Sequence, residues 1–239
     1  MRNTSLGITR IMIPKSSDLF ADRLREMILC GSLVTGDMLP SERSLVEESG
    51  LSRGSVREAL RTLEAEGLVE TVRGRSGGTR IAAPCRDSLT RSVEIFVRAN
   101  AVSLSALLDC RAAIEPMLAR LAARNRSAEE LEELEALQKQ FRESKDELIT
   151  YRAVNYRWHR QIAYCSRNEP LIILIDAILT TAHEARGFER VTTQDNREIA
   201  IEAHEVVMDA IRKQDEEAAA TAMEAHLVVY SRVTQVSEG

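Results

Sequence analysis

One segment near the N-terminus constrains the fold of this chain more than any other. It contains three motifs in close succession, namely LPSERSL at 39–45, SRGSVREAL at 52–60 and GLV at 67–69. Serine is a favoured N-cap residue, and both Ser41 and Ser52 stand directly before a helical pattern. Gly50 between them permits a tight turn. The segment therefore predicts two short helices joined by a turn.

A hairpin pattern follows the second helix. Residues 68–72 alternate between apolar and polar side chains as a half-buried strand does, and 79–81 can form the return strand. The six residues between them include three glycines and predict the turn. With a preceding helical pattern that starts at Ser17, these elements predict a winged helix-turn-helix domain over 12–83.

The second helix of this motif carries side chains suited to reading DNA. Arg53 and Arg57 are four residues apart, so they share one helical face, with Ser55 nearby. Arginine can donate two hydrogen bonds to a guanine edge or to a phosphate, and serine can contact either. We therefore expect the N-terminal end of this helix to enter a DNA major groove.

Further candidate DNA contacts flank this helix. Arg43 at the start of the preceding helix could hold the phosphate backbone, and Arg73 and Gly74 in the hairpin turn could approach a minor groove. The alternative is that these arginines form a solvated face with ordinary glutamate pairs. The combination of cap, glycine turn, arginine-bearing helix and glycine-rich hairpin favours DNA binding.

The net charge of −5 is unusual for a nucleic-acid binder, so its distribution matters. Through Pro84 the chain has 12 lysines and arginines against 11 acidic residues, whereas the remainder has 20 against 26. The acidity therefore belongs to the second part. Because there is no apolar run of membrane-spanning length, no signal-peptide pattern and no CxxC pair among the four cysteines, we expect a cytoplasmic protein with reduced thiols.

Beyond a short linker at 83–85 the chain has helical periodicity throughout. Aromatic residues make up only 4%, and glycine and proline are few, which favours helices over sheets. The helical stretches are 88–99, 103–125, one opened by a capping box at Ser127, 148–165, 170–188, 195–212 and 215–236. The sequence thus predicts a mainly α chain whose second domain, 86–237, is an antiparallel helical bundle.

Three of the four histidines have spacings that can bring them together. His159 lies four residues after Asn155, which places both on one helical face. His204 and His226 lie about ten residues before and eleven after a break at 214–215, so antiparallel helices would set them side by side. Three converging imidazoles suit a divalent metal, Zn²⁺ first and Ni²⁺ as the alternative. Taken singly, each histidine is more simply a satisfied polar residue of the interior.

Two charged residues stand on an otherwise apolar helix. Arg111 and Glu115 are four residues apart, which suits a partly buried ion pair that fixes the helix. Alternatively, Arg111 binds the carboxylate of a small effector, because its planar fork matches that group. The fourth histidine, His183, could line the same cavity, although a packing or surface role is the simpler interpretation.

Both parts of the chain resemble known families. Residues 16–83 resemble the winged helix-turn-helix of the GntR family of bacterial repressors, through LPSERSL, SRGSVREALRTLEAEGLV and RGRSGGTRI. The helical remainder resembles the FCD effector domain of the FadR-like branch, through LLDCRAAIEPMLARLAA, NYRWHRQIAYCSRNEPL and EAHEVVMDAIRKQDEEAAATAMEAHL. The resemblance implies a cytoplasmic homodimer that binds a palindromic operator and is released by a metabolite. It also implies that six residues of this chain lie at or beside the family's DNA-contact positions, namely Arg43, Arg53, Ser55, Arg57, Arg73 and Gly74.

The resemblance also implies a ligand set and an effector residue. Metal-binding members have Asp or Asn four residues before the first histidine, which implies a metal site formed by Asn155, His159, His204 and His226. Many members have Asp where this chain has Asn155, so the charge of the ion would be uncompensated and an anionic effector would be a more valuable partner. Several members that bind organic or sugar acids have arginine at the position of Arg111, which implies an effector contact there.

These observations predict a DNA-binding transcriptional regulator, most simply a repressor, controlled by an organic-acid or sugar-acid effector, and not an enzyme. One alternative is a purely metal-responsive repressor, and another is a DNA binder whose helical domain only dimerises. The third is a metal-dependent hydrolase, since a metal held by three histidines can activate water. Against the hydrolase, no HExxH-like pattern supplies a carboxylate base beside a histidine ligand.

Overall fold

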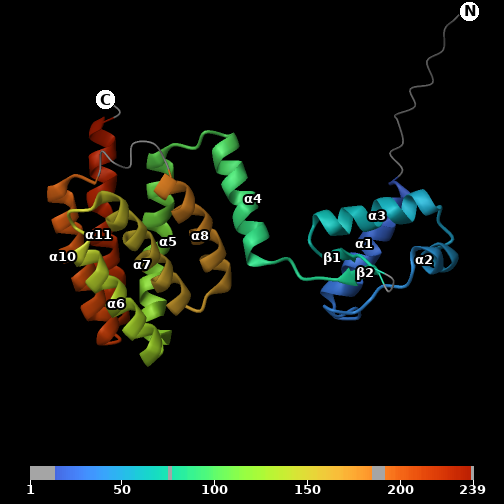
Figure 1. The fold of residues 1–239 in the computed structure, drawn as a ribbon, viewed down its shortest axis with the longest axis horizontal. Coiled ribbons are helices and arrows are strands. Elements are labelled where there is room, and N and C mark those ends of the chain that lie inside the picture. The colour runs from blue at the N-terminus through green and yellow to red at the C-terminus, as the bar shows by residue number, and fades with distance from the viewer. Residues whose placement is uncertain (1–13, 75–76, 185–191, 238–239) are drawn as a thin grey trace, which may run out of the picture. The chain divides into compact units, whose positions relative to one another are not determined.

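The computed structural model describes residues 14–74, 77–184 and 192–237 (Figure 1). Over these residues the chain consists of helices and one two-stranded antiparallel sheet, so the predicted mainly α fold is confirmed. The chain divides into two compact units, Met1–Ser88 and Leu89–Gly239.

The first unit has the predicted order of helices and strands. Its elements are α1 (Ser16–Leu29), α2 (Glu42–Ser49), α3 (Arg53–Ala65), β1 (Val69–Val72) and β2 (Gly78–Ile81). The side chains of Ser41 and Ser52 accept hydrogen bonds from the backbone N–H groups three residues on, which confirms both as N-caps. Gly50 ends α2 with φ 69°, a left-handed conformation that glycine adopts at little cost. The two helices therefore meet in the tight turn that the sequence predicts.

The core of the first unit comes from every one of these elements. Val56, Ala59 and Leu63 on one side of α3 are completely buried, and they pack with Leu24 of α1 and Ile81 of β2. The spacing of these α3 residues follows the helical period, so the opposite side of α3 faces outward. The packing thereby fixes which side of α3 can meet a ligand.

The second unit is a helical bundle. Its helices are α4 (Arg86–Ala99), α5 (Leu104–Asn125), α6 (Ala128–Glu143), α7 (Leu148–Cys165), α8 (Glu169–Glu184), α10 (Gln194–Arg212) and α11 (Glu216–Ser237). The capping box at Ser127 is present. The Glu130 carboxylate accepts a hydrogen bond from the Ser127 backbone N–H, and the Ser127 hydroxyl accepts one from the Glu130 backbone N–H. The helix expected to reach residue 188 is described as far as Glu184, and its predicted end lies outside the described residues.

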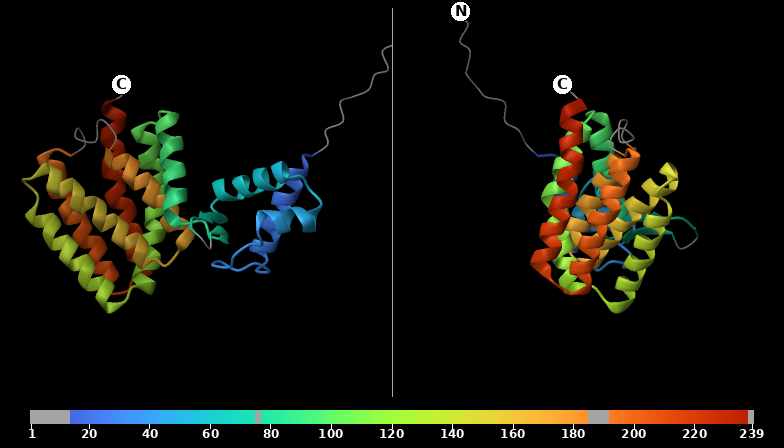
Figure 2. Two further views of the ribbon diagram at one scale, coloured as in Figure 1. Left: turned by 45° about the vertical axis from the view of Figure 1, so that its right-hand side comes forward. Right: turned by 90° about the vertical axis from the view of Figure 1, so that its left-hand side faces the viewer.

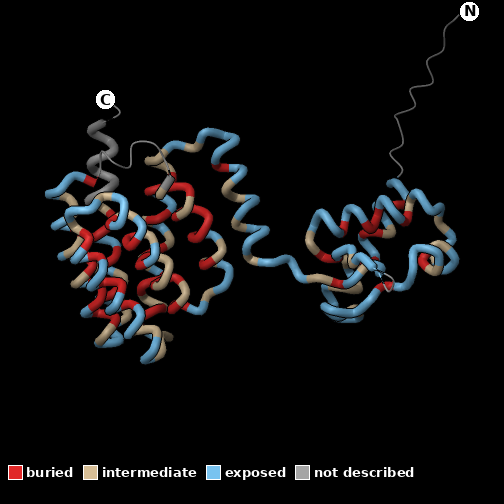
Figure 3. The backbone as a smooth tube through the Cα atoms, viewed as in Figure 1, coloured by how far each residue is buried: buried red, intermediate tan, exposed pale blue. Residues whose placement is uncertain are grey.

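The long helices α5 and α11 run side by side along the bundle, with α10 packed against α11 and α7 against α5 (Figures 1 and 2). Buried positions follow the facing sides of these helices, while their outer sides are exposed (Figure 3). The largest buried side chains of this core include Trp158, Tyr151 and Phe141. The same interior contains several charged and polar side chains, which form the site described below.

None of the helices in the described ranges combines the length and the apolar character that crossing a membrane requires. The four cysteines are free thiols, three of them exposed and Cys165 buried. Burial raises the pKa of the Cys165 thiol to about 12, so this residue packs as a neutral apolar group.

A core substitution in α3 tests this packing. Leu63→Ala should lower the free energy of unfolding of the first unit by about 2–5 kcal/mol, because it removes a completely buried side chain and leaves a cavity. Leu29→Ala is the control, since Leu29 is 72% exposed and its loss should change stability by less than about 0.5 kcal/mol. Urea denaturation followed by circular dichroism measures both. Equal losses for the two variants would contradict the described core.

Candidate DNA-reading surface and histidine centre

The arginines of the helix-turn-helix lie on its exposed side. Arg53 and Arg57 are exposed on α3, and the Arg57 guanidinium reaches across to Glu42 of α2 at 3.0 Å. Arg43 pairs with Glu47 one turn along α2 at 2.9 Å. Glutamate pairs of the kind expected for a solvated face are therefore present. Exposed pairs of this sort contribute about 0–1 kcal/mol, so a phosphate can replace the glutamate at little cost.

Ser55 has a more internal position than its neighbours. Its backbone N–H donates to the N-cap oxygen of Ser52, and its hydroxyl lies 2.9 Å from the Ser52 hydroxyl and 3.2 Å from that of Ser16. These contacts tie the start of α3 to the start of α1. Ser55 thus helps to fix the start of α3, and with it the position of the neighbouring Arg53 and Arg57.

The wing places Arg73 and Gly74 in exposed positions after β1. Gly74 has φ 127°, a conformation that other residues rarely adopt. Gly77 allows an equally tight turn, because a Cβ atom there would lie 2.5 Å from the carbonyl oxygen of Val72. The register that pairs Val69 with Ile81 continues to Val72 opposite Gly78. Residues 75–76 of the predicted turn lie outside the described residues.

The three histidines singled out from the sequence converge in the interior of the bundle. His159 of α7, His204 of α10 and His226 of α11 are each no more than 2% exposed. The Nε2 atoms of His204 and His226 are 3.1 Å apart, and those of His226 and His159 are 3.4 Å apart. The break between α10 and α11 therefore brings residues 22 positions apart side by side, as expected.

The geometry and protonation of this cluster fit a metal ion. A tetrahedral ion with bonds of about 2.0–2.1 Å holds its nitrogen ligands about 3.3 Å apart, which is close to the observed separations. Burial holds the pKa values of His204 and His226 well below their ordinary range, so both rings are neutral and each has one nitrogen that can bind a metal. Within the described residues these three side chains form a group that can hold a cation.

Aromatic rings fix the orientation of His204. Trp158 stacks on one side of that imidazole with ring centroids 3.7 Å apart, and Phe141 stacks on it at 4.5 Å. Trp158 thus packs between α7 and α10, with a cluster histidine as its partner. Phe141 carries no signal of this contact in the sequence, because it comes from α6 and its distance along the chain from His204 has no helical meaning.

A chain of charged contacts runs from α5 to the cluster. The Arg111 Nε atom lies 2.5 Å from Glu115 Oε1, and Glu115 Oε2 lies 2.5 Å from His159 Nδ1. Burial alone would raise the pKa of Glu115, but the charge of Arg111 and the contact with His159 outweigh it and hold that pKa far below its usual value. The ion pair expected between Arg111 and Glu115 is present. The contact of Glu115 with His159 joins two helices and has no signal in the sequence.

The residue predicted to bind the effector, Arg111, and two of the predicted metal ligands, Asn155 and His159, meet at one small cavity. It has a volume of about 10 Å³ and is lined by Arg111, Asn155, Tyr156, His159, Leu179, Ala182 and His183. Two buried polar atoms, Nη2 of Arg111 and Oδ1 of Asn155, have no hydrogen-bond partner in the described part of the chain. His183 lines the cavity as well, which was the less simple of its two interpretations. The cavity therefore joins a donor, an acceptor and a cluster histidine.

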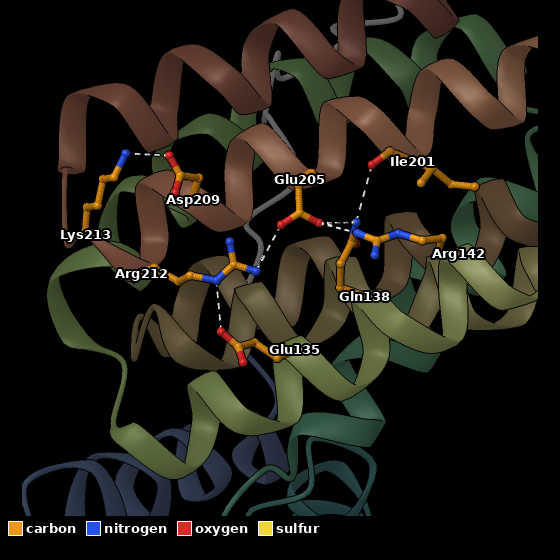
Figure 4. A network of polar contacts seen from close by, with 8 residues as sticks. All are labelled: Glu135, Gln138, Arg142, Ile201, Glu205, Asp209, Arg212 and Lys213. Carbon is orange, nitrogen blue, oxygen red and sulfur yellow. Dashed lines mark hydrogen bonds and ion pairs between the residues drawn. The ribbon is translucent and has the colours of Figure 1, made fainter.

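A network of polar contacts holds α10, the helix of His204, against α6 (Figure 4). Glu205 lies at its centre, with its carboxylate 2.8 Å from Arg142 and 3.0 Å from Arg212. Arg212 also pairs with Glu135 at 2.9 Å. Although Glu205 directly follows His204, these contacts hold its carboxylate on the α6 side, where it cannot serve the cluster as a base.

Comparison with known proteins agrees with both parts of this description. Residues 18–81 match the model of the bacterial regulatory proteins of the gntR family, and 106–228 match that of the FCD domain. The chain is 27% identical to the HTH-type transcriptional repressor NanR of Cronobacter sakazakii, over 93% of this chain and 86% of that protein. It is 28% identical to the galactonate operon transcriptional repressor of Escherichia coli K12, over 87% of this chain and 92% of that protein.

A solved structure has the same architecture. Streptococcus agalactiae GntR superposes with a TM-score of 0.62 at 26% sequence identity, covering 90% of this chain and 99% of that one. The FCD match alone spans more than half of the sequence, and the gntR match covers the unit that carries the exposed arginines. The chain therefore belongs to the GntR family of bacterial regulatory proteins, in the FadR-like branch that carries an FCD domain.

Proposed function

We propose that this protein is a cytoplasmic, homodimeric transcriptional repressor whose binding to a palindromic operator is controlled by a small carboxylate at a metal-containing pocket of the helical domain. The observation that carries the proposal is the meeting of Arg111, Asn155 and His159 of the buried histidine cluster at one cavity, in a chain that also has an arginine-bearing helix-turn-helix. Either half alone would suit many proteins, whereas the combination suits a sensor.

The DNA-binding part of the proposal rests on α3. Arg53 and Arg57 lie on the exposed side of this helix, and its buried side is fixed by the core. In the proposed complex they read base edges, while Arg43 and the wing residues Arg73 and Gly74 contact the backbone or the minor groove. Two such units in a dimer would match the two halves of a palindrome.

The metal-binding part rests on four side chains. His159, His204 and His226 would each supply an Nε2 atom, and Asn155 would supply its amide oxygen, which has no other partner among the described residues. Zn²⁺ is the first candidate and Ni²⁺ the second, because nitrogen-rich sites suit both ions. When bound, such an ion would supply an electrophilic centre for a carboxylate oxygen of the effector.

The effector part rests on Arg111. Its Nη2 atom, with no hydrogen-bond partner in the described part of the chain, lies beside the cavity at which Asn155 and His159 also lie. A carboxylate placed there would satisfy this donor. The E. coli relative is named for galactonate, a sugar acid, which supports a sugar acid or another organic acid as the class of effector.

The small size of the cavity offers a physical reason why effector binding would change the affinity for DNA. A volume of about 10 Å³ accommodates about one water molecule, so an organic acid must displace the lining side chains to enter. The effector then favours an arrangement of the helices that differs from the one described. It can lower DNA affinity only by its own preference for that arrangement, which in such systems amounts to about 1–3 kcal/mol.

Substitutions on the DNA-reading surface test the first part of the proposal. On a duplex selected from a random pool by the full-length protein, Arg53→Ala should weaken binding by about 1–3 kcal/mol and relax base preference, because it removes a base contact. Arg43→Ala should weaken all duplexes alike and reduce the salt slope of the binding constant by about 1, because it removes a phosphate contact. Quantitative gel-shift titrations at several salt concentrations measure both effects.

Arg23→Ala is the control for these variants, because Arg23 is 71% exposed on α1 and pairs with Glu26. It should bind the duplex as the parent protein does. If all three variants bind equally well, α3 is not the element that reads the operator.

The fluorescence of the protein tests the metal site, because Trp158 is its only tryptophan and stacks on His204. Ni²⁺, an open-shell ion, should quench this fluorescence and saturate near one ion per chain, and Zn²⁺ should restore it by displacing Ni²⁺. His226→Ala should abolish tight quenching while leaving the stack intact, and His183→Ala, outside the cluster, should not. Undiminished quenching in His226→Ala would place the ion elsewhere.

A thermal-shift screen of organic acids and sugar acids, each with Zn²⁺, Ni²⁺ or EDTA, tests the effector. A specific acid at about 100 times its Kd should stabilise the protein by about 2.7 kcal/mol and so raise its Tm. The shift should depend on metal and be lost in Arg111→Lys, which keeps the positive charge near Glu115 but lacks the fork. A shift from metal alone would favour a purely metal-responsive repressor.

A further inference from the structure

Two buried carboxylates occur in the described part of the chain, Glu115 and Asp176. Asp176 is paired by Arg160 and accepts the Tyr164 hydroxyl, and these contacts account for its burial. Glu115 differs because its second oxygen contacts a histidine of the cluster. It therefore has a possible role that Asp176 does not share.

We propose that Glu115 is the positioning residue of the histidine centre: it holds His159 with the proton on Nδ1, so that Nε2 points into the cluster. This inference deepens the proposed function and rests on it for the identity of the bound group as a divalent metal. The contact between Glu115 and His159 does not depend on that function.

The tautomer follows from the distance between the two residues. Glu115 Oε2 and His159 Nδ1 are 2.5 Å apart, and neither atom makes a hydrogen bond to any other described residue, so their lone pairs would repel each other unless His159 carries its proton on Nδ1. A neutral imidazole with its proton on Nδ1 has its lone pair on Nε2. That Nε2 atom is the one 3.4 Å from His226 Nε2, so the contact with Glu115 aims the lone pair at the cluster.

Glu115 acts on the histidine ligand and not on the net charge of the site. Its negative charge is already balanced by Arg111 at 2.5 Å, so the two residues together add no charge beside the cluster. A carboxylate behind a histidine ligand nevertheless fixes the orientation of the ring and makes that ligand more basic.

Arg111 determines where the Glu115 carboxylate sits. Its Nε atom holds Oε1 at 2.5 Å, and both residues lie on α5, one turn apart. Oε2 is thereby directed toward α7, the helix of His159. Because the remaining Nη2 atom of Arg111 lies beside the cavity, one arginine fixes the positioning residue and is available to a carboxylate.

The test compares the full-length parent protein with Glu115→Gln, which keeps the shape of the side chain and removes its charge. In metal-free protein, two-dimensional ¹⁵N–¹H spectra of the four histidine rings should report His159 as the Nδ1–H form, and this preference should be lost in the variant. Zn²⁺ affinity, measured by competition with a chromophoric chelator, should fall by about 10- to 100-fold.

Asp176→Asn is the matched control. It removes the charge of the other buried carboxylate of the same domain, also paired with an arginine, without touching the cluster. Its stability should fall, whereas its Zn²⁺ affinity and the His159 tautomer should match those of the parent protein. An equal loss of Zn²⁺ affinity in this variant would overturn the proposal, because the effect would then be one of general stability.

If Glu115→Gln does not fold, the ring spectra of the parent protein still test the assigned tautomer of His159. A parent protein with His159 as the Nε2–H form would overturn it outright, and so would a folded Glu115→Gln that binds Zn²⁺ as tightly as the parent. If the parent binds no Zn²⁺ at all, the metal part of the proposed function fails. In that case an Nδ1–H form that depends on Glu115 still supports the positioning role.

Discussion

The helical domain depends on the contact between Glu115 and His159, because it reconciles a buried negative charge with a buried cluster of imidazoles. A carboxylate that is 2% exposed must be paired, and Glu115 is paired on both sides, by Arg111 within α5 and by His159 across the interface to α7. Removing Arg111 would leave a charge without compensation in the interior, and removing His159 would leave Oε2 of Glu115 without its contact. These contacts therefore restrict how far α5 and α7 can rotate about their own axes, more than apolar packing alone would. The restricted rotation sets the direction in which His159 faces.

The rest of the cluster is held by contacts of a different kind. His204 lies between the rings of Trp158 and Phe141, and the network around Glu205 ties the outer side of the same helix to α6. The inner side of α10 is thus positioned by stacking and its outer side by ion pairs. Burial keeps the pKa values of His204 and His226 low, so the cluster adds no net charge to the core. A set of polar rings can therefore occupy the centre of a bundle whose remaining interior is apolar.

How far the sequence predicts this structure depends on whether contacts are local. The caps at Ser41 and Ser52 can be predicted from the sequence because each hydrogen bond joins residues three apart. The contact of His204 with His226 can be predicted because a single break joins two antiparallel helices. The stacking of Phe141 on His204 and the contact of Glu115 with His159 cannot be predicted in this way. Each joins helices whose relative rotation is decided by the packing of the whole bundle, and a spacing along the chain carries no information about it.

The same packing explains why binding at this cavity can be converted into a change elsewhere. A cavity already large enough for an organic acid would accept it without rearrangement, and a ligand that fits two arrangements equally well shifts neither. Here the lining side chains leave space for about one water, while Arg111 offers a guanidinium nitrogen without a hydrogen-bond partner in the described part of the chain. Entry of a carboxylate is thus favoured by the arginine and opposed by the closed packing of α7 and α8. Because α7 carries His159 and α8 carries His183, the opening that admits the ligand must also displace residues beside the histidine cluster. Under the proposed function, effector and metal should therefore alter each other's affinity by equal factors.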